Sequence, residues 1–114
     1  MKPVTFPLFD TSVDKVIELI KRAEKVIYKH IDKKTGDIFL AILVNAGNRD
    51  SIYSRYVVTF DMGKIEFFDN GYSLRLEIEA VCLGDMDTYT HFSWEITEEE
   101  YKKIRAAIEG LLSE

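Results

Sequence analysis

The chain has 114 residues, of which 46% are hydrophobic, and a formal net charge of -5 at pH 7. This length is sufficient to bury a hydrophobic core, and we predict one domain over residues 1–114. The single cysteine excludes an intramolecular disulfide, and no run approaches the roughly 18 apolar residues of a membrane-spanning helix. Because the first residues lack a signal-peptide pattern, we expect a cytoplasmic protein that does not bind membranes.

Acidic residues are concentrated in the second half of the chain. Residues up to Phe60 include ten basic and seven acidic residues, whereas those from Asp61 onward include five and thirteen. Phosphate contacts require Lys and Arg, so we expect no nucleic-acid partner for the second half. An acidic surface is instead compatible with a basic protein partner.

The chain begins with two prolines that favour an extended leader over residues 1–10. Thr11, with Asp14 three residues later, is typical of a capped helix start. Apolar residues then recur at helical spacing, namely Val13, Val16, Ile17 and Ile20. We predict a helix over about 11–25.

Residues 26–31 allow two interpretations. They could continue the preceding helix, but Val26-Ile27-Tyr28 favours a strand, and residues 32–37 with Gly36 are typical of a hairpin loop. We favour a hairpin that pairs residues 26–31 with 38–44. Residues 38–44 are apolar at every position, so we expect this strand inside the sheet and covered on both faces.

Residues 51–97 predict a four-stranded antiparallel meander. Asn70-Gly71 is the strongest two-residue signal for a type I′ turn, and a turn there would pair Ile65 with Leu76 on the inner face. A second tight turn is expected at Met62-Gly63.

The strand that starts at Tyr72 and the strand that ends at Ile96 both alternate between apolar and polar residues. The register that joins opposite charges sets Ile78 opposite Phe92, Leu76 opposite Trp94, Glu79 opposite His91 and Arg75 opposite Glu95. Cys82 then points inward, where a reduced thiol acts as a small hydrophobic group.

Thr97 and Glu100 form a capping-box pattern that predicts a helix over 98–112. Its apolar stripe consists of Tyr101, Ile104, Ile108 and Leu111. Strands grouped between two terminal helices indicate an α+β fold. We predict an antiparallel meander sheet of five to six strands, over about 26–96, with an N-terminal and a C-terminal helix packed on it.

No catalytic, metal or cofactor motif is present, so we assign no catalytic residue, no metal and no cofactor. The two turns expected above would set Val57 opposite Phe68 on a charged outer face. Such a pair would be covered by the leader around residues 6–9 or by a helix. Otherwise it would form a contact patch, with Tyr53 or Tyr89, for a partner protein or a second copy of the chain.

Four further residues are candidate binding groups. His91 opposite Glu79 has the composition of a base with an orienting carboxylate, although a solvated charge pair across the two strands is the simpler explanation. Asp85 and Asp87 offer oxygen ligands for a divalent cation, but turn chemistry also explains them.

These observations favour a non-catalytic protein-binding module, such as a small acidic inhibitor or immunity-like protein that acts on a basic partner. A homodimer through the apolar outer-face patch is a further expectation. The alternative is a small-molecule-binding protein or modest hydrolase, with a pocket between sheet and helices that includes His91 and Glu79.

Overall fold

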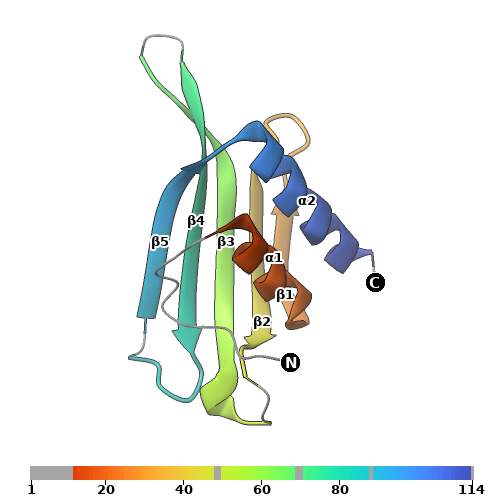
Figure 1. The fold of residues 1–114 in the computed structure, drawn as a ribbon, viewed down its shortest axis with the longest axis vertical. Coiled ribbons are helices and arrows are strands. Elements are labelled where there is room, and N and C mark those ends of the chain that lie inside the picture. The colour runs from red at the N-terminus through yellow and green to blue at the C-terminus, as the bar shows by residue number, and fades with distance from the viewer. Residues whose placement is uncertain (1–11, 48–49, 69–70, 88, 114) are drawn as a thin grey trace.

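The computed structural model describes residues 12–47, 50–68, 71–87 and 89–113. In chain order the elements are α1 (Val13–Lys21), β1 (Ala23–Ile31), β2 (Ile38–Asn45), the short 3-10 helix η1 (Ile52–Ser54), β3 (Arg55–Glu66), β4 (Tyr72–Cys82), β5 (Tyr89–Ile96) and α2 (Glu98–Leu112). The strands form one antiparallel sheet in the order β1-β2-β3-β4-β5 (Figure 1). The predicted α+β fold with a meander sheet and two helices is confirmed.

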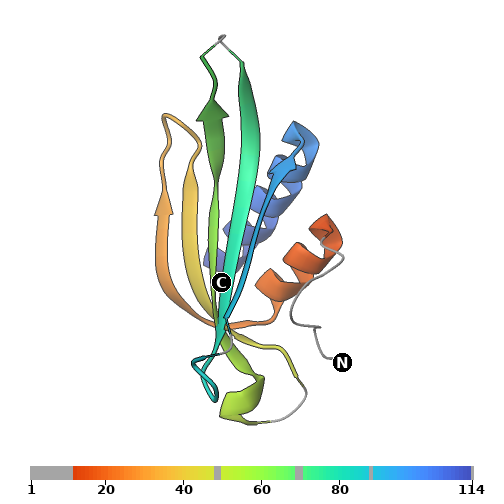
Figure 2. The ribbon, with the colours of Figure 1, turned by 90° about the vertical axis from the view of Figure 1, so that its left-hand side faces the viewer.

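Both helices lie on the same face of the sheet, as Figure 2 shows in side view. The core between these layers contains Leu19 of α1, Phe60 of β3 and Ile104 of α2, all fully buried. Burying a side chain of this size stabilises the fold by about 1.5–3 kcal/mol before entropy losses. The helix stripes and the even-numbered residues of β2, β3 and β4 therefore hold the two layers together.

Helix α1 is shorter than predicted. Ser12 is its N-cap and accepts a hydrogen bond from the Lys15 backbone N–H at 3.3 Å, whereas the predicted cap, Thr11, and the leader lie outside the described residues. The helix ends at Lys21, and β1 begins at Ala23 rather than after residue 25. The strand preference of the following residues prevails over the apolar spacing that would extend the helix.

The hairpin of β1 with β2 is confirmed. Ile31 pairs with Ile38, and two register shifts interrupt β1 between Ala23 and Lys25 and between Val26 and Tyr28. Strand β2 lies between β1 and β3, as predicted, but described helices cover only one of its faces. The expectation of cover on both faces is therefore not met within the described part of the chain.

The predicted turn at Met62-Gly63 is wrong. Strand β3 continues through this dipeptide to Glu66, and the register of β3 with β4 pairs Met62 with Leu76 and Glu66 with Tyr72. The pairing of Ile65 with Leu76, expected from a two-residue turn at Asn70-Gly71, is also wrong, because Ile65 lies opposite Ser73 and faces outward. The Phe67 N–H donates to the Gly71 carbonyl at 2.8 Å, and Asn70 of the predicted type I′ turn lies outside the described residues.

Gly63 lies inside β3 because another side chain approaches its backbone. A Cβ atom at this position would collide with the Asp37 carboxylate, which also accepts a hydrogen bond from the Lys64 N–H at 3.4 Å. Glycine in a strand often marks such a close approach rather than a turn. Its interpretation as a turn residue was therefore the error at Met62-Gly63.

The predicted register of β4 with β5 is confirmed at all four positions, namely Leu76 with Trp94, Ile78 with Phe92, Glu79 with His91 and Arg75 with Glu95. Helix α2 also matches the prediction. Thr97 Oγ1 accepts from the Glu100 N–H at 3.1 Å, and the Glu100 carboxylate accepts from the Thr97 N–H at 2.9 Å, which completes the capping box. Neither helix in the described residues has the length and apolar character needed to cross a bilayer.

Candidate functional site

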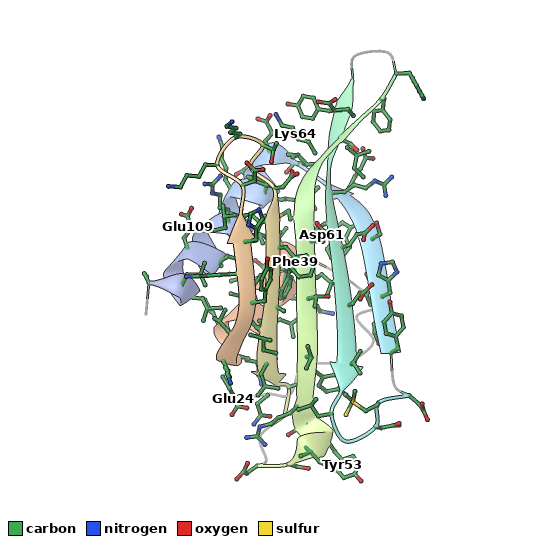
Figure 3. The ribbon with its side chains drawn as sticks, turned by 180° about the vertical axis from the view of Figure 1, so that it is seen from behind. Glu24, Phe39, Tyr53, Asp61, Lys64 and Glu109 are labelled. Carbon is green, nitrogen blue, oxygen red and sulfur yellow. The ribbon has the colours of Figure 1, made fainter. Side chains whose placement is uncertain are left out.

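The sheet face opposite the helices carries the largest group of predicted binding residues. Figure 3 views this face directly, with Phe39 of β2 and Asp61 of β3 labelled on it. Phe39 is 38% exposed, while its neighbours Leu40 and Ile38 point into the core. No helix or strand among the described residues covers this surface, which we call the open face.

An apolar row crosses the open face. The register places Leu43, Val57, Val81 and Tyr89 side by side on four adjacent strands. The three aliphatic side chains are partly buried, and Tyr89 is exposed at the β5 end. Toward β1, Tyr28 and Phe39 add an edge-to-face aromatic contact with ring centroids 5.9 Å apart. The row and this pair form a band of apolar and aromatic groups on a sheet surface that would otherwise be polar.

An acidic block, consisting of Asp61, Glu77 and Glu79, borders the apolar row. Asp61 of β3 lies directly opposite Glu77 of β4, and like charges in this arrangement repel. Burial raises the pKa of the Asp61 carboxyl above its ordinary value, and the charges of Glu77 and Asp37 raise it further. This arrangement of negative charges therefore lowers the stability of the folded sheet.

Polar side chains of β5 contact the acidic block. His91 Nε2 lies 3.9 Å from a carboxylate oxygen of Glu77, although Glu79 is the register partner of His91. Tyr89 interacts with Glu79 instead. Loss of solvent raises the pKa of the Tyr89 phenol, and its hydrogen bond to Glu79 with the nearby carboxylate charges raises it further.

The structure brings four of the seven predicted binding residues together on the open face, namely Val57, Glu79, Tyr89 and His91. It does not bring Val57 next to Phe68. Val57 pairs with Leu43 and Val81, whereas Phe68 lies beyond the end of β3 and is fully exposed. The continuous β3 strand separates the two residues by most of its length. The expected cover by residues 6–9 concerns residues outside the described part of the chain.

Asp85 and Asp87 lie in the connection between β4 and β5. The Asp85 carboxylate accepts a hydrogen bond from the Asp87 N–H at 3.2 Å, which is the geometry of an Asx turn. Among the described residues, no group of three or more His, Cys, Asp and Glu side chains is arranged to hold a metal ion. Turn formation accounts for both residues.

Cys82 and His91 lie on opposite faces of the sheet. Cys82 is buried on the helix side, with its Sγ 3.5 Å from the Tyr53 carbonyl oxygen, while His91 lies on the opposite face. This thiol and imidazole therefore cannot act as a nucleophile and base pair. His91 and Glu79 also lie outside the space between sheet and helices where the small-molecule alternative requires them.

Sequence reasoning missed Leu43 and Val81 of the apolar row and the aromatic pair of Tyr28 with Phe39. The signal was present in β2, whose apolar residues on both faces were interpreted as full burial. An equally good explanation is a strand with one face in the core and one face available for contact.

No family model, curated protein or solved structure matches the chain.

Proposed function

We propose that the chain is a non-catalytic binding protein that docks the basic surface of another protein on the open face of its sheet. The observation that carries this proposal is the apolar row beside the acidic block. Interface centres combine aromatic and apolar groups, and surrounding charges select and orient the partner. The open face offers both parts on a single rigid sheet.

The shape of the face supports a protein partner. The band from Tyr28 and Phe39 to Tyr89 extends across all five strands, which is the breadth of a protein contact surface. Aromatic side chains lose little conformational entropy on contact and are frequent energetic centres of interfaces. We therefore expect Phe39 and Tyr89 to contribute most of the contact area.

The charge of the face supports a basic partner over a second copy of the chain. Two copies docked through the open face would bring their acidic blocks together, which costs free energy. A basic surface would instead neutralise the repulsion between Asp61 and Glu77. The homodimer expected from the sequence is therefore the less favourable use of this face, and a cytoplasmic inhibitor or immunity-like role is the specific form of the proposal.

Affinity capture from the source organism at low and high salt tests the proposal, with each captured protein identified, purified and titrated against the chain. Glu79→Lys reverses a charge in the acidic block. Glu66→Lys makes the same change on the helix side, because Glu66 pairs with Tyr72, whose hydroxyl donates to Glu98 of α2 at 3.0 Å.

We expect a basic protein whose affinity falls by about tenfold or more with Glu79→Lys and little with Glu66→Lys. Equal losses for the two variants would place the contact elsewhere or reduce it to general charge attraction. Concentration-dependent self-association that Phe39→Ser abolishes would instead assign the face to a second copy.

A further inference from the structure

A second candidate site lies on the helix side, at the end of the sheet. It is a pocket of about 400 Å³ between the β1–β2 loop, strands β3 and β4, and the first half of α2. This volume falls within the usual range for small-molecule sites. Leu74 and Tyr101 supply apolar surface, and no histidine lines the pocket.

Cationic side chains dominate the lining. They are Lys33, Lys34, Lys64, Lys102 and Arg105, against the single carboxylate of Glu98. This concentration is unexpected in a chain of net charge -5. The positive charges come from the loop, from β3 and from α2, so only the fold brings them together. The local sign of charge is opposite to that of the whole chain, which favours an anionic ligand.

Hydrogen bonds fix the loop that presents two of these lysines. The Asp32 carboxylate accepts from the backbone N–H groups of Lys34 at 2.8 Å and Thr35 at 3.3 Å, and these bonds lower the Asp32 pKa. Gly36 has a φ of 80°, a conformation that favours glycine, and its carbonyl accepts a hydrogen bond from the Tyr101 hydroxyl. The loop is therefore tied to α2, and the two sides of the pocket keep a defined separation.

Three of the lining side chains, Glu98, Lys64 and Arg105, already contact neighbouring side chains. Tyr72 donates to Glu98 at 3.0 Å, and the Lys64 ammonium lies 4.7 Å from the centre of the Tyr72 ring. The Arg105 Nε–H donates to the Glu109 carboxylate at 2.9 Å. A guanidinium has five N–H donors, so this hydrogen bond does not use all of them. Lys and Arg together suit phosphate oxygens, Lys as a point charge and Arg as a planar donor.

We propose that this pocket binds a small molecule that carries a phosphate group, with Lys64, Lys102 and Arg105 as the principal contacts. Five cations match a ligand of two or more negative charges better than a monocarboxylate. The N-terminus of α2 is not the binding element, because the capping box already uses Thr97 and three glutamates occupy the first turn. The pocket and the open face lie on opposite sides of the sheet, so this proposal does not depend on the protein partner.

Isothermal titration with inorganic phosphate, pyrophosphate, ATP and citrate tests this proposal. Lys102→Gln removes a lining charge, and Lys103→Gln removes the same charge from the adjacent residue, which does not line the pocket. Both lysines are exposed on α2, so neither substitution should prevent folding.

We expect pyrophosphate or ATP to saturate the protein with a Kd below about 1 mM. Lys102→Gln should weaken this binding by about tenfold, and Lys103→Gln by less than about twofold. Tighter binding of ATP than of pyrophosphate supports a phosphate ester, and equal binding supports recognition of the phosphate groups alone. The proposal is overturned if no phosphate compound saturates the protein in this range, if citrate binds equally well, or if the two variants lose affinity equally.

Discussion

Glu77→Gln should stabilise the protein, because it removes one of two carboxylates that face each other across β3 and β4. Two unit charges about 5.5 Å apart repel by about 0.8 kcal/mol in water. Physiological salt reduces this value by about half. Partial burial of Asp61 acts in the other direction, so we expect a gain of about 0.5 kcal/mol in the free energy of unfolding.

Urea denaturation at about pH 8 measures this repulsion, because the midpoint reports the free energy of unfolding. The expected gain corresponds to a rise of about 0.4 M in the urea midpoint. Glu95→Gln is the matched control, because the same change removes an attractive partner of Arg75 on the same face. This control should lower the midpoint.

The pH dependence provides a second check. The Asp61 pKa is higher in the folded chain than its ordinary value of 3.8, so ionised Asp61 destabilises the folded state. This destabilisation disappears as the pH falls through the raised pKa toward 3.8. The advantage of Glu77→Gln should therefore shrink on acidification and with added salt. A lower midpoint for Glu77→Gln at pH near 8, or a gain that does not depend on salt, would refute the reasoning.

Three further substitutions test the supports of the fold. Thr97→Ala removes the α2 cap and should lower the free energy of unfolding by about 1 kcal/mol in urea denaturation; an unchanged value would mean that the Glu100 half of the box is sufficient. Tyr101→Phe removes the hydrogen bond to the Gly36 carbonyl and should cost about 1 kcal/mol, with faster amide exchange in the β1–β2 loop. Exchange as slow as in the wild type would show that the loop does not depend on α2. Asp32→Asn should destabilise at neutral pH. Backbone hydrogen bonds lower the Asp32 pKa below 3.8, so its stabilisation is present above that value and is lost as the pH falls through the lowered pKa. Urea midpoints across this range should therefore converge for the variant and the wild type, and a constant difference would contradict the assignment.

Sequence reasoning succeeded where two independent signals agreed. The register of β4 with β5 was determined by the alternation of apolar residues together with the charge pairing of Arg75 with Glu95. The start of α2 was determined by Thr97 and Glu100 together. Failure at Met62-Gly63 had a physical origin, because the reason for Gly63 is the carboxylate of Asp37, distant in sequence. A contact between residues so far apart leaves no local signal.

The candidate sites could likewise be predicted from the sequence only in part. The alternation of apolar and polar residues predicted that Tyr89 and His91 face outward, and it also predicted the pairing of His91 with Glu79. The apolar row also required the register of β3 with β4, which the wrong turn at Met62-Gly63 obscured. The cationic pocket was not predictable, because Lys34, Lys64 and Lys102 belong to three elements whose meeting is a result of the fold.

The meander order has a consequence for how the chain reaches this structure. Each strand pairs with its neighbour in sequence, so the sheet can grow by successive hairpins that close only short loops. Helices α1 and α2 contact each other across the same sheet face, yet the whole sheet separates them along the chain. Closing that long loop costs more conformational entropy than closing a hairpin. The free energy of packing the helices offsets this cost only when the sheet surface has already formed. We therefore expect the contact between the helices to form late, and the inner face of the sheet to stay exposed to water until α2 arrives.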